Sequence, residues 1–270
     1  MKQQGASSRS ALEKFARTQR PRAVPGVEIV ETPRYVLRLM PSFPIPGPNS
    51  VSFIRCEAAD VDEIVRDVEA TFAAKDLPYN WVLEPESTPA NIASLLEERG
   101  IVTDPEDGEA AVMILPADAP LKMPAVKGLT FEDAHRDLDT FAASERVAAE
   151  AFAGLPYGDP MPMDATREQR LRYSQADPNR RGVLATVNGE PAGSGSLSLF
   201  GADGAIINAG AVRPKFRGLG VYRALVAARM QMARESGAAG LVVWGGRMSA
   251  PILSRLGFEK VSWRRFYVKA

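Results

Sequence analysis

The chain has 270 residues, 45% of them hydrophobic and 24% charged, and its 33 basic and 33 acidic residues give a formal net charge of zero. This length and composition predict one or two globular domains with a full apolar core. The zero net charge provides no overall basic field for nucleic acid, so we expect no nucleic-acid partner.

Cys56 is the only cysteine, so an intramolecular disulfide is excluded and a reducing compartment is favoured. No apolar run approaches the ~18 residues that a membrane-spanning helix needs, and the first residues lack the apolar core of a signal peptide. No histidine, cysteine or acidic cluster has the spacing of a metal site. We therefore expect a cytoplasmic protein that binds neither a membrane nor a metal.

The N-terminal part of the chain predicts a tail followed by a smaller α/β lobe. Residues 1–25 are polar and rich in Lys, Arg, Gln and Ser, which favours a flexible tail with at most a short helix around 11–16. Residues 26–118 combine strand-like apolar runs with an amphipathic helix that begins after Asp60, and its apolar face runs from Val61 to Phe72. The proline-bounded segment 116–120 is the predicted linker to a second domain, residues 121–270.

The second domain predicts a mixed sheet. Asn188-Gly189 is a strong hairpin signal between two strands, and a strand-helix-strand unit begins near residue 206. Because hairpins pair strands antiparallel and a strand-helix-strand unit pairs them parallel, the fold class is α/β with a mixed sheet. The expected order is a strand (126–131), a helix (138–152), a short helix (166–175), strands (181–187, 190–200 and 206–212), a helix (from 221), a strand (241–244), a helix (249–256) and a last strand (263–268).

One junction in this order has the chemistry of an anion site. Pro214 cannot continue a central strand, so the strand ends near Arg213, and Lys215 to Gly220 form a basic loop with two glycines. The free N–H groups and dipole at the helix start, with the charges of Arg213, Lys215 and Arg217, favour a diphosphate. A Walker loop and a dinucleotide fingerprint both fail, because the lysine-hydroxyl pair and the third glycine are missing. The residues after the loop recur at spacings of three and four, which predicts a helix: Tyr222, Leu225, Val226, Arg229, Met232 and Ala233.

These residues resemble motif A of the GNAT superfamily of acyl-CoA-dependent N-acyltransferases. The positions that fit the motif are Val212, Pro214, Arg217, Gly218 and Gly220, with Tyr222 in its last, usually small, position. Further on, Leu256-Gly257-Phe258 resembles the end of motif B. The resemblance covers roughly the second half of the chain and implies a GNAT-like fold there, with acetyl-CoA or a related acyl-CoA as the acyl donor.

The resemblance also implies which residues hold the donor. The pantetheine arm is expected along the strand that ends at Val212, and the diphosphate on the N–H groups of the loop. A backbone N–H near residues 210–212 is expected to face the thioester carbonyl. The expected cofactor-binding residues are Ala211, Val212, Arg213, Arg217, Gly218, Leu219, Gly220, Val221 and Tyr222.

The catalytic residues of many relatives do not carry over. Leu253 stands where those relatives have a tyrosine acid, and the strand before the loop carries Asn208 in place of a carboxylate. Asn208 and Ser249 are the remaining candidates to orient a water or the thiol, and the structural alternative for Ser249 is a helix N-cap. The residues expected on an exposed surface are His135, Glu145 and Glu150.

A faint internal repeat links the two halves. The sequence LLEERGI at 95–101 resembles ILSRLGF at 252–258. Two explanations stay open for the N-terminal lobe: a degenerate GNAT-like domain without a phosphate loop, or an unrelated α/β lobe that packs against the catalytic one.

The sequence therefore predicts an N-acyltransferase that moves an acetyl group from acetyl-CoA to a primary amine of a small molecule or peptide, by direct attack of the amine on the thioester. The alternative is a non-catalytic acyl-CoA-binding regulatory or scaffold module, which the missing tyrosine and carboxylate favour. Both a monomer and a homodimer fit the sequence.

Overall fold

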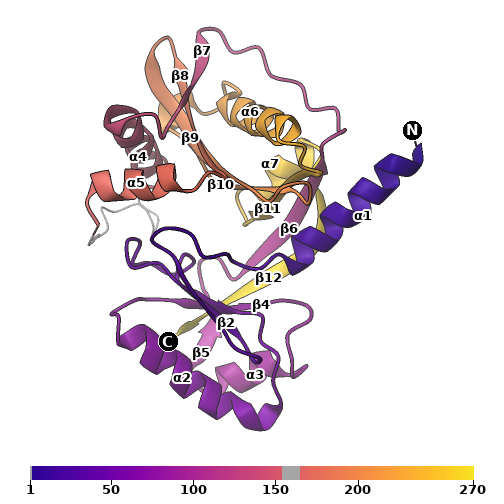
Figure 1. Ribbon diagram of the computed structural model, residues 1–270, viewed down its shortest axis with the longest axis vertical. Coiled ribbons are helices and arrows are strands. Elements are labelled where there is room, and N and C mark those ends of the chain that lie inside the picture. The colour runs from indigo at the N-terminus through magenta and orange to yellow at the C-terminus, as the bar shows by residue number, and fades with distance from the viewer. Residues whose placement is uncertain (1, 154–164) are drawn as a thin grey trace.

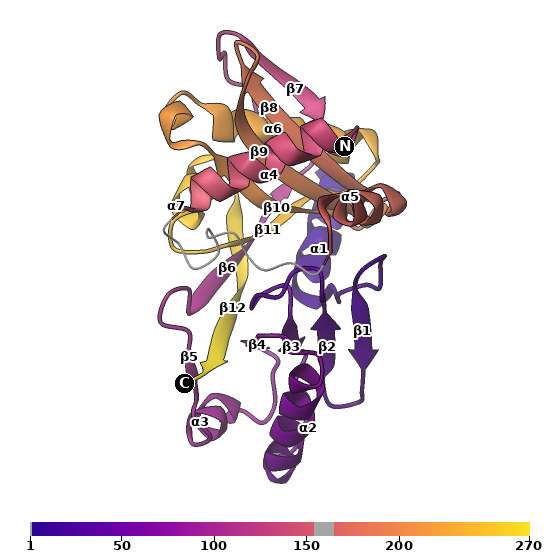
Figure 2. The same cartoon turned by 90° about the vertical axis from the view of Figure 1, so that its left-hand side faces the viewer.

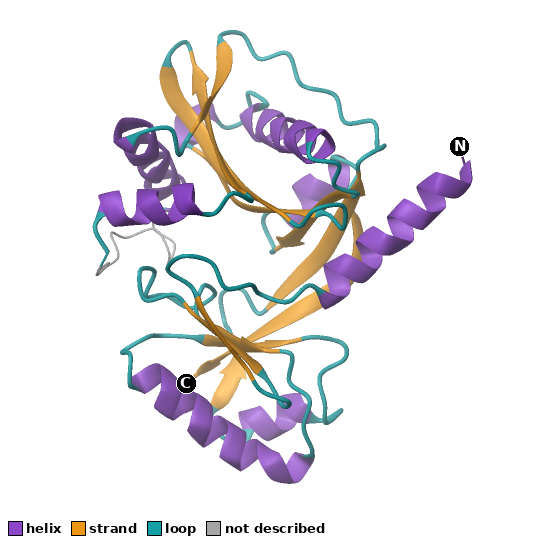
Figure 3. Ribbon diagram, viewed as in Figure 1, coloured by secondary structure: helices purple, strands orange, loops and turns teal. Residues whose placement is uncertain are grey.

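The strands of the described residues all join one sheet that runs the length of the molecule (Figures 1 and 3). The computed structural model describes residues 2–153 and 165–270. The strand order is β1-β2-β3-β4-β12-β6-β11-β10-β9-β8-β7, and β5 pairs with β12 beside this path. Because β10 and β11 are parallel while β8 and β9 are antiparallel, the predicted mixed sheet is confirmed.

The helices are α1 (Lys2–Thr18), α2 (Val61–Ala73), α3 (Ile92–Glu97), α4 (Leu138–Phe152), α5 (Arg167–Ala176), α6 (Val221–Glu235) and α7 (Ala250–Arg255), with 3-10 turns η1 (Ala58–Asp60) and η2 (Pro214–Phe216). The strands are β1 (Glu28–Glu31), β2 (Val36–Leu39), β3 (Ser50–Ser52), β4 (Asn80–Leu83), β5 (Ile101–Thr103), β6 (Glu109–Pro116), β7 (Leu129–Asp133), β8 (Arg180–Val187), β9 (Glu190–Leu199), β10 (Ala205–Val212), β11 (Gly240–Gly245) and β12 (Glu259–Lys269).

The helices divide the molecule into two lobes (Figure 2). In the N lobe, which comprises β1–β5, α2 and α3, the helices cover one face of the sheet and bury Leu37, Phe72 and Trp81. In the C lobe, which comprises β7–β11 and α4–α7, α6 and α7 cover one face of the sheet through Val226 and Leu253. Helix α4 covers the opposite face of β8–β10.

The two lobes exchange strands. Strand β6 follows the N lobe in sequence, yet it pairs with β11 on one side and β12 on the other, inside the sheet of the C lobe. The end of β12 pairs with β4 through Phe266 and Val82 and with β5 through Val268 and Val102, inside the sheet of the N lobe. One continuous hydrogen-bonded sheet therefore joins the two lobes. It includes β6, which comes before the predicted linker at 116–120, and β12, which comes after it.

Helix α1 replaces most of the expected N-terminal tail. Leu12 is 0% exposed, and Phe15 and Ala16 lie beside it in a cluster with Val112 and Val242. The spacing of these three residues puts them on one helical face, and that face packs on β6. The expectation of a flexible tail was wrong for this segment. The local sequence does not show the burial, because the strands that cover this helical face come from residues far away in the sequence.

The two segments of the faint repeat have the same local structure. Helix α3 ends at Glu97 and is followed by a turn through Gly100 into β5, and α7 ends at Arg255 and is followed by a turn through Gly257 into β12. Both glycines have positive φ angles, 72° and 93°, a conformation that few other residues adopt.

Candidate functional site

The site begins where β10 and β11 diverge. These parallel strands pair only at Ala205 with Leu241 and at Ile206 with Val242. Beyond Ile206, the edge of β10 that faces β11 has no ladder partner among the residues that the structure describes. An unpaired strand edge can accept an extended ligand as an additional strand.

Past the point of divergence, β10 contains a bulge. Its register with β9 shifts between Asn208 and Ala211, and Ala209 has a φ of 49°. A bulge turns main-chain N–H groups away from the regular ladder. Ala209 and Gly210 have no ladder partner on β9, so their main-chain groups are not held by the regular ladder.

The loop after β10 ends in a set of unpaired N–H groups. Gly218 and Gly220 have φ angles of 80° and 90°, and Gly220 occupies the position before the first turn of α6. The first helical bond runs from the N–H of Ala224 to the oxygen of Gly220. Within the described ranges, the N–H groups of residues 218–222 have no protein acceptor, and the Leu219 side chain is 54% exposed. We call residues 218–222 the cradle, because unpaired N–H groups at a helix start, together with the helix dipole, favour an anion.

The basic residues of the loop contribute less free charge than their number suggests. Arg213 donates to Glu150 at 2.6 Å and to Glu190 at 2.8 Å, and Lys215 also pairs with Glu190. Arg217 donates only to main-chain oxygens, at 3.3 Å to Val212 and at 2.8 Å to Ala151. Arg217 is therefore the cation of this loop whose charge no described carboxylate neutralises.

Tyr222 fits its unusual position because a glycine faces it. A Cβ atom added to Gly210 would lie 3.0 Å from the Tyr222 ring, so a larger residue at 210 would collide with it. Burial raises the pKa of Tyr222, which keeps the phenol neutral. The ring thus packs between α6 and the bulge of β10.

A buried arginine supports the bulge from the α6 side. Arg229 is 1% exposed, and its Nη1 donates to the main-chain oxygens of Ser196 at 3.3 Å and Asn208 at 3.2 Å. These oxygens lie where β9 and β10 lose register, so the guanidinium replaces the missing ladder bonds. Burial lowers the pKa of Arg229 to about 10, which leaves it protonated at pH 7. Its Nη2 has no partner in the part of the chain that the structure describes.

Sequence reasoning missed Arg229, although a signal was present. Arg229 stands four residues after Leu225, in the apolar spacing of the helix, where a charged residue is unusual. A charge at an apolar position predicts either a kept ion pair or a set of buried carbonyl acceptors. Here the acceptors are carbonyls.

Comparison with known proteins identifies this part of the chain. Residues 146–258 match the model of the acetyltransferase (GNAT) family. This region is a GNAT acetyltransferase domain. A search of curated proteins finds no match for the chain.

The similarity to solved structures extends beyond the GNAT domain to most of the chain. A GCN5-related N-acetyltransferase from Kribbella flavida is 18% identical, with a TM-score of 0.67 over 97% of this chain and 95% of that one. Another from Sphaerobacter thermophilus is 18% identical, with a TM-score of 0.62 over 87% and 79%. A tandem GNAT protein from the clavulanic acid biosynthesis pathway is 16% identical, with a TM-score of 0.58 over 98% and 94%. At these identities the likeness shows a shared fold.

The two expected catalytic residues of the GNAT domain come from different elements: Asn208 lies on β10, and Ser249 lies between β11 and α7. Ile207 packs in the cluster under α6 and α7, so Asn208 points to the opposite face, where it is exposed. Ser249 precedes α7, and its Oγ donates to the oxygen of Gly246 at 3.4 Å without capping the helix. Asn208 therefore points away from the face of the sheet that α7 covers.

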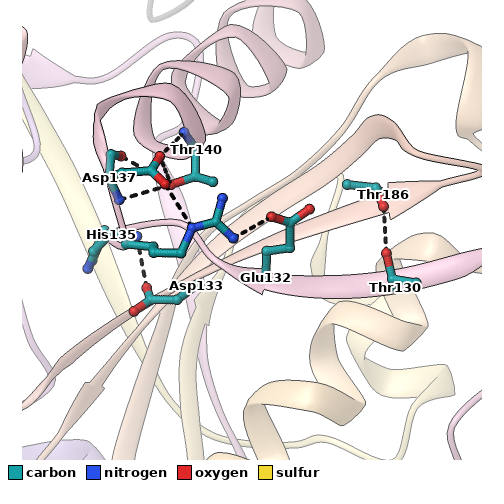
Figure 4. A network of polar contacts seen from close by, with 8 residues as sticks. Thr130, Glu132, Asp133, His135, Asp137, Thr140 and Thr186 are labelled. Atoms are coloured by element: carbon teal, nitrogen blue, oxygen red, sulfur yellow. Dashed lines mark hydrogen bonds and ion pairs between the residues drawn. The ribbon is translucent and has the colours of Figure 1, made fainter.

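His135 lies at the start of α4 (Figure 4). Asp137 caps this helix by accepting the Thr140 N–H at 2.8 Å, and Asp133 accepts the His135 N–H at 2.8 Å. The imidazole is half-buried against Gly182, so the expected solvated position was wrong. Burial, with the charge of Arg180, lowers the pKa of His135 to about 4, and the ring is neutral at pH 7.

The remaining candidate groups are structural. Glu145 binds Arg167 and Arg170, each at 2.7 Å, and Glu150 binds Arg213. Among the described residues, no three His, Cys, Asp or Glu side chains converge on a metal position. No described helix is long and apolar enough to cross a membrane.

Proposed function

We propose that the GNAT domain transfers an acetyl group from acetyl-CoA to a primary amine of a small molecule or peptide. The observation that carries this proposal is the open run of N–H groups from Gly218 to Tyr222 beside the unpaired edge of β10. A diphosphate requires such donors at a helix start, and a pantetheine arm requires such an edge.

The residues of the cradle have distinct roles in this proposal. The N–H groups of Gly218, Leu219, Gly220, Val221 and Tyr222 hold the diphosphate. Arg217 supplies charge, while Arg213 braces the loop against α4 through Glu150. Ala211 and Val212 offer main-chain groups to the pantetheine arm, because within the described residues the edge of β10 that faces β11 is unpaired there.

The transfer needs little help from acid groups. An alkyl amine titrates near ~10 and must lose a proton before it attacks, whereas a thiol titrates near ~8.5 and leaves readily. The bulge at 209–211 offers an N–H to the carbonyl oxygen as it gains charge. In this proposal Asn208 orients a water or the amine on the exposed face of the sheet. Ser249 contacts the thiol of CoA.

We also propose that the N lobe, residues 26–118, is a degenerate GNAT-like repeat of residues 121–270. The shared course of α3-Gly100-β5 and α7-Gly257-β12 supports this proposal. The strand exchange supports this proposal as well. In the N lobe, β12 lies between β4 and β5; in the C lobe, β6 lies between β11 and β12 in the same way. The single cysteine is compatible with a cytoplasmic location.

The cradle is tested with the variant Leu219→Glu and its neutral match Leu219→Gln. The Leu219 side chain is exposed, so neither change disturbs packing. A carboxylate beside the diphosphate should weaken CoA binding by about tenfold or more, because like charges repel at the helix start. The glutamine variant should bind CoA within about twofold of the wild type, measured by calorimetry at low salt.

Equal CoA affinity in the two variants would contradict the cradle. A second measurement separates the enzyme from the non-catalytic module: free thiol is followed while the protein is incubated with acetyl-CoA and a panel of amines. Tight CoA binding without amine-dependent thiol release would favour the module.

A further inference from the structure

Within the described residues, two arginines from different lobes have no carboxylate partner. Arg38 lies on β2 of the N lobe, and Arg180 begins β8 of the C lobe. Both are half-buried. Among the described residues, the Arg38 guanidinium makes only a 3.9 Å contact with the sulfur of Met40, and the Arg180 side chain makes no hydrogen bond or ion pair.

Strand register shows where Arg38 points. Leu37 and Val51 pack under α2 and α3, so Arg38 and its neighbour Ser50 occupy the other face of the N-lobe sheet. That face is turned toward the C lobe (Figures 1 and 2). Asn80 pairs with Ser50 and continues this polar row. Asn80 is 5% exposed, and its Oδ1 has no partner within the described residues.

Register also places Arg180 on the same face as Asn208. Arg180 pairs with Ser198 on β9, and Ser196 pairs with Asn208 on β10. Ser194, on the same side of β9, donates to the main chain of α4, so this is the face opposite α6. Arg180 and Asn208 are two strands and two residues apart, on the order of 10 Å, so one small molecule can contact both.

The charge of Arg180 acts on the Arg38 guanidinium across the two lobes. Burial, with the nearby Arg180 charge, lowers the pKa of Arg38, and burial lowers that of Arg180. Asp177 lies near Arg180, but its carboxylate already accepts from Arg22 at 2.9 and 3.2 Å. Neither guanidinium forms an ion pair with a carboxylate of the described residues, so an anionic ligand would offset the cost of burying two like charges.

We propose that Arg38 and Arg180 together bind an anionic group, a carboxylate or a phosphate, of the amine acceptor. The inference rests on the proposed acetyl transfer and names the class of its acceptor: a small amine that carries a negative charge. Guanidinium forks match carboxylate and phosphate oxygens in a two-point contact. The N lobe then contributes directly to the acceptor site through Arg38.

The test uses the variants Arg38→Gln and Arg180→Gln, with Arg172→Gln as the control. Arg172 is exposed on α5, so its substitution changes the net charge equally without touching the site. CoA affinity is measured first for every protein. Inorganic phosphate and acetate are then titrated separately into CoA-saturated protein, so that the cradle is occupied, and the midpoint of thermal unfolding is followed.

We expect at least one anion to raise the unfolding midpoint of the wild type and the Arg172→Gln variant. Its apparent affinity should fall by about tenfold or more in Arg38→Gln and Arg180→Gln. The anion that acts distinguishes a phosphate site from a carboxylate site. Unchanged CoA affinity in all four proteins would show that the two arginines act apart from the cradle.

A kinetic arm uses matched amines: phosphoethanolamine with ethanolamine, and β-alanine with propylamine. The charged member of a pair should be preferred by the wild type, and the preference should vanish in the Arg38 and Arg180 variants, with the KM for acetyl-CoA unchanged. Arg38→Lys keeps the positive charge and should retain part of the preference for the charged amine. Such retention would show that the loss in Arg38→Gln does not come from misfolding. The inference is overturned if neither anion stabilises the wild type, or if Arg38→Gln and Arg180→Gln respond as the control does. If CoA does not bind the wild type, the proposed function itself fails.

Discussion

The guanidinium of Arg229 donates to the main-chain oxygen of Asn208 at 3.2 Å, across the bulge where β10 leaves its register with β9. The arginine therefore holds the main chain that the proposed thioester site depends on, although its side chain is on the far face of the sheet from Asn208. Its effect on transfer has to pass through the shape of the backbone at 208–211.

Replacing Arg229 by methionine should slow acetyl transfer more than it weakens donor binding. The carbonyls of Ser196 and Asn208 lose their donor, which costs about 1–3 kcal/mol for each unsatisfied group and lets the bulge relax. We expect kcat to fall about tenfold or more, while the KM for acetyl-CoA changes by less than about threefold, because the cradle at 218–222 is untouched. Gln231→Met, on the exposed side of α6, is the control. A wild-type kcat in Arg229→Met would show that the arginine does not position the bulge.

Acid should destabilise the fold through His135. Its folded pKa of about 4 lies below the unfolded value of ~6.5, so the unfolded chain binds the proton more readily between these values. Stability is then fully present above pH ~6.5 and falls as the pH drops toward 4. From pH 7 to pH 5 the contribution is at most about 2 kcal/mol.

The check is urea unfolding of the wild type and His135→Gln at both pH values. The variant should lose less stability than the wild type on acidification. The same loss in both proteins would assign the acid sensitivity to other groups.

Shortening Leu12 should lower the stability of the whole sheet. The side chain is fully buried between α1 and β6, so Leu12→Ala removes packed methyl groups and leaves a cavity. Such changes cost about 2–5 kcal/mol of unfolding free energy. Lys14→Ala, at an exposed position of α1, should change it by less than about 0.5 kcal/mol. An effect of Leu12→Ala as small as that of the control would mean that α1 is only loosely attached.

Cutting the chain between the lobes should leave the two fragments together. A protease site inserted after Lys122 lies in the segment before β7 that has no regular structure. After cleavage, β6 remains between β11 and β12, and β12 remains paired with β4. We expect the fragments to co-elute on size exclusion in 1 M NaCl and to separate only in denaturant. Separation under native conditions would contradict the strand exchange.

The sequence allowed the loop of the candidate site to be predicted, because the necessary information is local. Pro214, Gly218 and Gly220 each restrict the backbone at their own position, and the helix start after them follows directly. The same reasoning predicted the hairpin at Asn188-Gly189, which joins β8 to β9.

Features that depend on distant pairing were not predictable in this way. Nothing within 109–116 indicates that β6 pairs with β11, since its apolar run fits either lobe equally well. Leu12 and Phe15 became a buried face only because that strand is placed beside them. The charges of Arg213 and Lys215 were overestimated for the same reason, as Glu150 and Glu190 are far from them in the sequence.

The exchange of β6 and β12 also affects how the protein is made. The sheet of the N lobe stays incomplete during translation until β12 has left the ribosome. At ~5–20 residues per second, synthesis of the C lobe leaves β4 and β5 without the strand between them for on the order of 10 s. During that interval two strand edges of the N lobe are open to pairing with other strands.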